Sequence, residues 1–175
     1  MTDKAIEPLV PKEGLHVLHL FYKIEHGQWQ LATAEEQRQA MTRLSQLVGE
    51  IRATPSTQLL IFSMVSPKAD IGFMLLTPDL HAANRFEKRL TLSLGPDVLT
   101  PVYSYLSLTE QSEYTSSDEE LAANLAAEGA VKPGTPEFDA KMDEIRARMA
   151  KYKKDKLYPN LPDWPVFCFY PMSKR

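Results

Sequence analysis

The stretch that decides the fold is QLLIFSMVSPKADIGFMLLT, residues 58–77. It contains two segments rich in aliphatic and aromatic side chains, residues 58–66 and 70–77, with only a short polar linker around Pro67 and Lys68 between them. Two such segments at this spacing predict a β-hairpin, although the linker lacks a glycine. The hairpin supplies two adjacent antiparallel strands, and the elements on either side of it determine the topology.

One strand is predicted well before the hairpin, over residues 15–24, which follow Gly14 and are largely apolar. His16 and His19 fall on opposite faces of this strand, because side chains alternate along a strand. The alternation argues against a metal site shared by the two imidazoles.

A helix is predicted between that strand and the hairpin. Thr33 and Glu36 have the spacing of a capping box, in which each side chain satisfies a free donor at the helix start. Pro55 ends the pattern. The apolar residues that recur at helical spacing between them are Met41, Leu44, Leu47, Val48 and Ile51.

A second helix and a fourth strand are predicted after the hairpin. Pro78 and Asp79 open the helix, and Gly95 with Pro96 closes it. The strand covers residues 101–108, with Tyr103, Tyr105 and Ser107 on one face and Val102, Ser104, Leu106 and Leu108 on the other. The apolar stripe of the helix consists of Leu80, Ala83, Phe86, Leu90 and Leu94.

The order strand, helix, strand, strand, helix, strand predicts an α+β fold of the ferredoxin-like class. In this arrangement two crossover units form one antiparallel sheet, and both helices cover the same face. The other face of the sheet is left bare, and here it would carry apolar and aromatic side chains. Exposed patches of this kind mark an interface, so we expect this face to bind a partner.

The character of the chain changes after residue 114. Ser117 and Glu120 form a second capping box, and Thr135 with Pro136 starts a further helix. A helical hairpin over residues 115–155 is therefore predicted as an insertion, acting as a lid, as an oligomer contact or as a structural elaboration only. Its basic end could steer anions or be a solvated helix terminus. The second helix is lined on one side by Phe138, Met142, Ile145, Met149 and Tyr152.

The last segment, residues 156–175, has the sequence KLYPNLPDWPVFCFYPMSKR. Prolines punctuate its first half, and residues 166–170 are apolar on both alternating faces, which predicts a strand covered on both sides. Ser173, Lys174 and Arg175 follow it. The pattern is typical either of a solvated basic tail or of a receptor for an anionic, largely apolar ligand. We therefore divide the chain into residues 1–114, 115–155 and 156–175.

Composition narrows the class of protein. A chain of 175 residues with 43% hydrophobic and 25% charged residues suits one globular domain. Its net charge of −3 gives no support for nucleic-acid binding. Cys168 is the single cysteine, which excludes an intramolecular disulfide, and its apolar neighbours predict a buried, reduced thiol. We expect no signal peptide and no membrane span, and therefore a cytoplasmic protein.

The string FYPMSKR at residues 169–175, preceded by LYP at 157–159, resembles the central motif of the coproheme decarboxylases, the haem-synthesising branch of the chlorite dismutase family. The resemblance is weak before about residue 60 and stops over about 115–155. Upstream it extends through Lys68–Asp70, Asn84–Glu87, Pro101–Ser107 and Ser112–Tyr114.

This resemblance implies peroxide-dependent decarboxylation of coproheme to haem b, with the iron porphyrin as both substrate and cofactor. Within this resemblance, Tyr170 matches the family residue that forms a radical and takes a hydrogen from a propionate. Lys174 matches a propionate-facing lysine, and Tyr114 a tyrosine near the porphyrin edge. Lys156 stands where the family has an arginine, so the charge is kept but the planar fork is lost. Two further residues, Met172 and Ser173, match the segment that contacts the substrate.

The resemblance also implies a second ferredoxin-like half, which would carry the histidine that ligates the haem iron. None of His16, His19, His26 or His81 lies in the matching motif, so we assign no iron ligand here and expect it from a separate chain or a continuation. We further expect an oligomer. Two alternatives stay open: a binding or assembly subunit of the same family without catalysis, and an unrelated ferredoxin-like module that binds a small molecule or a protein.

Overall fold

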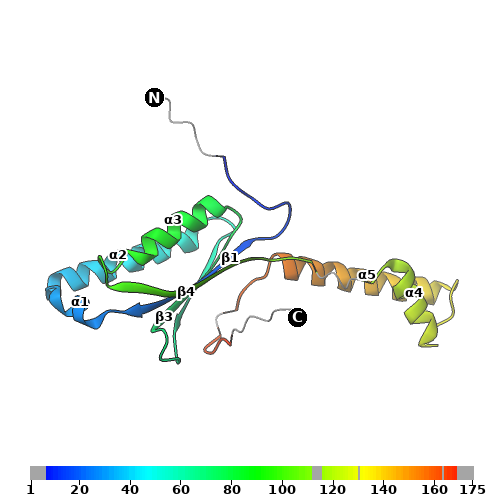
Figure 1. Cartoon of the computed structure of the whole chain (residues 1–175). Helices are drawn as coiled ribbons and strands as arrows, with labels where there is room; N and C mark the ends of the chain where they lie inside the picture. Colours follow the sequence, from blue (N-terminus) through cyan, green and yellow to red (C-terminus); the bar gives the residue numbers. More distant parts are fainter. Residues whose placement is uncertain (1–6, 112–115, 130, 163, 169–175) are drawn as a thin grey trace.

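The computed structural model describes residues 7–111, 116–129, 131–162 and 164–168 (Figure 1). Its elements follow the chain in the order strand, two helices, two strands, helix, strand and two helices. Their bounds are β1 His16–Ile24, α1 His26–Leu31, α2 Ala34–Ala53, β2 Gln58–Ser63, β3 Ile71–Thr77, α3 Leu80–Thr91, β4 Leu99–Leu108, α4 Asp118–Ala127 and α5 Pro136–Leu157.

The four strands form one antiparallel sheet in the order β2-β3-β1-β4, and α2 and α3 lie together on one of its faces (Figure 1). In the register His19 of β1 is opposite Met74 of β3 on one side and Tyr105 of β4 on the other. This arrangement confirms the predicted ferredoxin-like fold. The β2–β3 hairpin is also present, with a longer connection than predicted because β2 ends at Ser63.

The main core lies between the sheet and the two helices. Ile51 of α2, Leu75 of β3 and Leu90 of α3 are completely buried there. Tyr22 is buried among them, and its hydroxyl lies 2.7 Å from Thr91 Oγ1, which satisfies the only polar atom of its side chain. The alternation of strand side chains therefore sends one set of β1 and β3 residues to the helices and leaves the other set on the opposite face.

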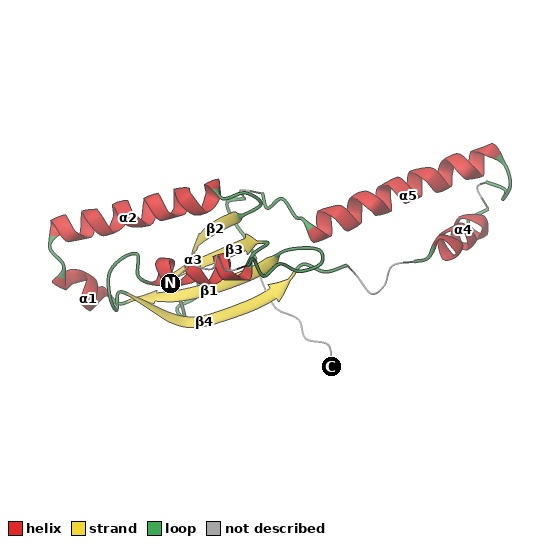
Figure 2. Cartoon of the chain, turned by 90° about the horizontal axis from the view of Figure 1, so that it is seen from above, coloured by secondary structure: helices red, strands yellow, loops and turns green. Residues whose placement is uncertain are grey.

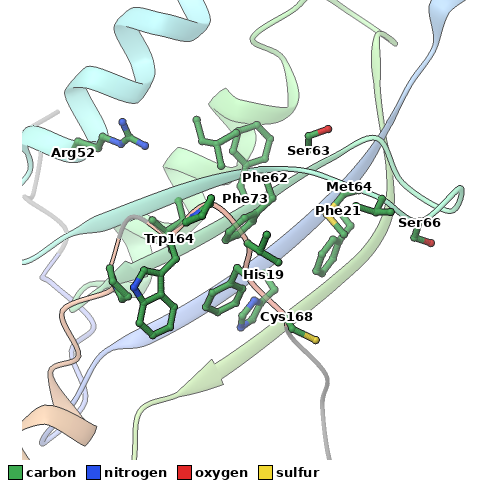
Figure 3. A pocket seen from close by; sticks show the side chains of 17 residues that line it. His19, Phe21, Arg52, Phe62, Ser63, Met64, Ser66, Phe73, Trp164 and Cys168 are labelled. Carbon is green, nitrogen blue, oxygen red and sulfur yellow. The ribbon is translucent and has the colours of Figure 1, made fainter.

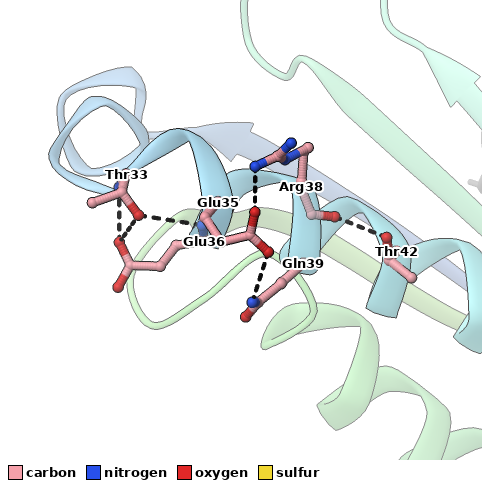
Figure 4. A network of polar contacts seen from close by, with 6 residues as sticks. All are labelled: Thr33, Glu35, Glu36, Arg38, Gln39 and Thr42. Atoms are coloured by element: carbon pink, nitrogen blue, oxygen red, sulfur yellow. Dashed lines mark hydrogen bonds and ion pairs between the residues drawn. The ribbon is translucent and has the colours of Figure 1, made fainter.

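Helix starts are capped as the sequence predicts. At α2, Glu36 N donates to Thr33 Oγ1 and Thr33 N donates to Glu36 Oε2, which completes the predicted capping box (Figure 4). At α3, Asp79 accepts from His81 N and Ala82 N. Asp79 also accepts from Leu9 N, so this one carboxylate ties the N-terminal arm to the start of α3.

Helices α4 and α5 form a hairpin that projects away from the sheet (Figure 2). Its own small core consists of Leu125, Phe138 and Met142, with Ile145 packed at its edge. The predicted capping box at Ser117 and the N-cap at Thr135 are both present. The hairpin is thus held together by contacts between its two helices rather than by the sheet.

The predicted C-terminal strand is wrong over the residues that the structure describes. Val166, Phe167 and Cys168 are not in a strand, and Cys168 is exposed rather than buried. Strand propensity forms a strand only where a neighbouring backbone offers hydrogen bonds, and in the described part of the chain no strand pairs with this segment. The remainder of the prediction, Phe169 and Tyr170, lies outside the described residues.

Candidate functional site

The face of the sheet opposite α2 and α3, here called the open face, carries a cluster of aromatic side chains. His19 and Phe21 of β1 are paired in register with Tyr105 and Tyr103 of β4. Their ring centroids lie 6.0 Å apart for His19 and Tyr105 and 5.9 Å apart for Phe21 and Tyr103. Tyr103 is 52% exposed and Tyr105 is 40% exposed. This agrees with the prediction that the open face carries aromatic side chains; that a partner covers them stays a prediction.

Gly72 makes room on the open face next to this cluster. It lies in β3, in register with Phe21 on one side and Phe62 of β2 on the other. A Cβ at this position would lie 3.0 Å from Met64 Sδ and 3.4 Å from Phe21 Cδ1. The absence of a side chain in a strand permits such close approach of neighbouring groups, so Phe21 and Met64 can lie directly over the backbone.

The C-terminal segment, residues 158–162 and 164–168, folds back over part of the open face (Figure 1). Gln58 fixes it with two hydrogen bonds: its Nε2 donates to Pro159 O at 2.6 Å, and its Oε1 accepts from Leu161 N at 2.9 Å. Leu161 packs against the buried cluster of Leu15, Val17 and Leu76. The segment is therefore attached to the sheet by both polar and apolar contacts.

A cavity of about 480 Å³ lies between the open face and the C-terminal segment (Figure 3). Phe62 stacks on Phe167 with ring centroids 5.3 Å apart and an interplanar angle of 22°, which closes one side. Trp164 of the segment and Phe21 of the sheet are also part of the lining. The volume falls within the range of about 300–1,000 Å³ that is usual for small-molecule sites.

Two basic side chains also line the cavity, His19 and Arg52. His19 is 4% exposed, and its burial lowers the pKa of the imidazole below its ordinary value, so the ring is neutral at neutral pH. Arg52, at the end of α2, donates from Nε to Leu59 O at 3.1 Å. The cavity thus combines aromatic walls, a neutral imidazole and one guanidinium.

His16 and His19 lie on opposite faces of β1, as the alternation predicts. His16 Nε2 lies 3.2 Å from Leu9 O of the N-terminal arm, whereas His19 lines the cavity. Among the described residues, no three His, Cys, Asp or Glu side chains are grouped closely enough to hold a metal ion. None of the described helices has the length and apolar character needed to cross a bilayer.

Of the site residues predicted from the sequence, only Lys156 lies within the described part of the chain. It is exposed on the last turn of α5, with Nζ 5.6 Å from the centroid of the Tyr152 ring, and is not among the residues that line the cavity. The other predicted site residues lie outside the described residues: Tyr114, Tyr170, Met172, Ser173 and Lys174.

Sequence reasoning assigned no role to the side chains that line the cavity. The available signal was the parity of β1, which places His19 and Phe21 on the same face, together with the Pro-rich segment that contains Trp164. Fold and cavity together define a class: a ferredoxin-like α+β domain with an aromatic binding surface on the open face of its sheet.

The family follows from a comparison of the sequence with known protein families. Residues 35–175 match the model described as chlorite dismutase. Because the match covers most of the chain, the protein belongs to the chlorite dismutase family.

Solved structures of two similar proteins extend this finding. A novel haem-binding protein from Thermus thermophilus, whose function was identified from its structure, is 26% identical, with a TM-score of 0.59; the match covers 91% of this chain and 55% of that one. A mutant chlorite dismutase from Candidatus Nitrospira defluvii is 14% identical, with a TM-score of 0.52, over 59% of this chain and 43% of that one. A second mutant of that enzyme is 12% identical, with a TM-score of 0.53, over 66% and 49%. This chain therefore spans about half the length of the structures it matches.

Proposed function

We propose that this chain is one half of a coproheme decarboxylase-like haem protein, and that a second ferredoxin-like half completes the site and supplies the iron ligand. The observation that carries the proposal is the aromatic open face, with its cavity, in a member of the chlorite dismutase family. The similar Thermus thermophilus protein is described as haem-binding, and this chain covers 55% of it. Contact with a porphyrin and a second domain would remove this exposed aromatic surface from water, which is favourable.

The described residues fit an iron porphyrin in part. Phe21, Phe62 and Trp164 offer apolar ring faces to a planar macrocycle, and stacking of this kind is favourable in an offset or tilted geometry. Arg52 brings a guanidinium to the lining, and this group binds carboxylates well. A full set of propionate partners is not supplied by these residues, so the proposal also needs the motif at residues 169–175.

In this proposal the motif residues have the roles that the family resemblance implies. Lys174, and Lys156 as a weaker single-point contact, would hold propionate carboxylates. Met172 and Ser173 would contact the substrate, and Tyr114 would lie near the porphyrin edge. The motif follows in sequence directly after Cys168, which lines the cavity. The chain would thus bring cations and a phenol to the substrate from one short segment.

Tyr170 would act as the residue that takes a hydrogen atom from the propionate. Hydrogen peroxide would be the oxidant, and the bound iron porphyrin would supply the chemistry that passes its oxidising equivalents to the phenol. For each propionate, one C–H bond and the bond to the carboxylate break, carbon dioxide leaves and a vinyl group forms. The two electrons and the protons reduce one peroxide to two waters. Tyr170 must therefore be held in contact with the propionate and away from bulk water.

The test combines this chain with coproheme and with the part of the Thermus thermophilus protein that the structural match leaves uncovered. We expect the Soret band of coproheme to shift only when both polypeptides are present, and added peroxide to release carbon dioxide. Binding without carbon dioxide would overturn the decarboxylase assignment and favour a non-catalytic assembly subunit. No shift under either condition would overturn haem binding as well.

The role of Tyr170 is tested in the same complex with Tyr170→Phe. We expect coproheme binding to be retained and release of carbon dioxide to fall by at least about 100-fold, because the phenol supplies the only proposed hydrogen acceptor. Tyr152→Phe, at a half-exposed tyrosine on α5 that does not line the cavity, is the matched control and should keep full activity. Unchanged decarboxylation in Tyr170→Phe would remove the proposed role.

A further inference from the structure

The apolar side of α5 extends beyond the part that α4 covers. Phe138, Met142, Ile145, Met149 and Tyr152 follow one another at intervals of four and three residues, the spacing of a seam that packs against another helix. Helix α4 covers the first part of this seam, where Phe138 and Met142 are buried. Beyond α4 the seam is open, since Tyr152 is 49% exposed.

Charge is strongly separated along the same hairpin. The tip, defined as residues 117–144, carries eight carboxylates and only two cations, Lys132 and Lys141. The base, defined as residues 146–157, carries six cations and one carboxylate, Asp155. A helix dipole favours acidic residues in its first turn and basic residues in its last. The separation here continues through the middle of α5, so the dipole explains only part of it.

Few of the base cations are neutralised inside the chain. Arg146 pairs with Asp118 at 3.0 Å and with Asp143 at 3.1 Å. Among the described residues, none of the other five base cations forms an ion pair with a carboxylate. The hairpin projects away from the sheet (Figure 2), and the base is exposed or half-exposed except at Leu157, which is buried where α5 reaches the sheet. It therefore presents an apolar strip flanked by positive charge.

We propose that the α4–α5 hairpin is a contact between two copies of this chain, in which the acidic tip of one copy lies on the basic base of the other. The charge of the tip is opposite to that of the base. Every copy of the chain carries both, so a second copy offers an acidic tip that complements the basic base. In an antiparallel pair the contact forms twice, because the arrangement is symmetric. The partner would also cover Met149 and Tyr152 and complete the seam.

The test is a charge exchange, measured by sedimentation equilibrium or light scattering at low ionic strength. The base variant is Lys151→Glu with Lys154→Glu, and the tip variant is Asp139→Lys with Glu144→Lys; all four side chains are exposed. We expect the wild type to self-associate and each variant to associate at least about 10-fold more weakly, since several charge pairs turn repulsive. An equimolar mixture of the two variants should restore association to within a few-fold of the wild type.

Arg38→Glu with Arg43→Glu on the exposed face of α2 is the matched control, because it reverses two cations on a helix outside the hairpin (Figure 4). It should associate like the wild type. Circular dichroism checks that every variant keeps its helices. If the wild-type chain stays monomeric at about 100 μM, the contact is overturned. A mixture of the two variants that fails to restore association would overturn it as well. Coproheme binding is measured separately, so loss of the hairpin contact is distinguishable from failure of the proposed function.

Discussion

The sheet body and the α4–α5 hairpin bury their cores to different extents, although both contain amphipathic helices. In the body, Ile51 and Leu90 are completely buried because two helices and four strands enclose them. In the hairpin, Phe138 is 8% exposed, and its cluster is built only from α4, α5 and Val131 of their connection among the described residues. An apolar stripe therefore stabilises a helix only as far as a neighbour covers it.

The difference shows which apolar surface each region leaves uncovered by its own residues. The body closes its core with its own residues and leaves an aromatic face open on the other side of the sheet. The hairpin covers part of its seam and leaves Tyr152 half exposed. We expect mutations in the body to be felt by the whole domain, and mutations in the hairpin or the C-terminal segment to be felt locally.

The largest effect is expected from Leu90→Ala in the body. Removing a completely buried leucine leaves a cavity and should lower the free energy of unfolding by about 2–5 kcal/mol. Urea denaturation followed by circular dichroism measures it. Leu92→Ala is the matched control, since Leu92 is 63% exposed and its removal should change stability by less than about 0.5 kcal/mol. Equal effects for the two leucines would contradict the assigned core.

A smaller and local effect is expected from Phe138→Ala in the hairpin. The ring belongs to a small cluster within the hairpin, so the loss should be about 1–3 kcal/mol, below the usual range for an enclosed phenylalanine. Hydrogen exchange resolved by segment should show faster exchange in α4 and α5 and unchanged protection in β1 and β3. Equal loss of protection in the sheet would mean that hairpin and body unfold as one unit.

Most of the body could be predicted from the sequence because its signals are local. The capping box at Thr33, the cap at Asp79 and the alternation in β1 each specify an element and its face. Helix α1 was missed, since its six residues, His26–Leu31, contain no buried side chain and hence no apolar pattern. The predictable part of the fold is therefore the part in which burial and local pattern coincide.

The candidate site could be predicted much less well. Its cavity depends on where the C-terminal segment folds back, and one determinant is Gln58, which is 103 residues away from Leu161 in the chain. No local pattern carries that information. The motif residue Tyr170 was identified by family resemblance and stays a prediction. The strand at residues 166–168 was wrong because propensity alone does not supply a pairing partner.

A moderate, pH-dependent effect is expected from Asp79→Ala. Partial burial opposes ionisation, but hydrogen bonds from Leu9 N, His81 N and Ala82 N together lower the pKa of Asp79 below its ordinary value. A lowered folded-state pKa stabilises the protein above the unfolded-state pKa, and this contribution is lost as pH falls through the folded value. The variant should be about 1 kcal/mol less stable at pH 7. The gap to wild type should begin to narrow below about pH 4, where the carboxyl becomes protonated in the unfolded state, and it should close as the pH falls through the lower pKa of the folded state. A gap that does not change with pH would contradict the cap.

The smallest effect, and the one that separates the C-terminal segment from the body, is expected from Gln58→Ala. It removes both hydrogen bonds to Pro159 O and Leu161 N, which water can replace in part, so global stability should fall by only about 0.5 kcal/mol. The segment should nevertheless be cleaved faster by a protease, because it would leave the sheet more often. Gln39→Ala is the matched control, because within the described part of the chain the Gln39 side chain donates only to Glu35 on its own helix (Figure 4). If the segment stays protected in Gln58→Ala, then Leu161 and the Phe62–Phe167 stack are sufficient to hold it on the sheet. The cavity would then depend on these apolar contacts rather than on the two hydrogen bonds.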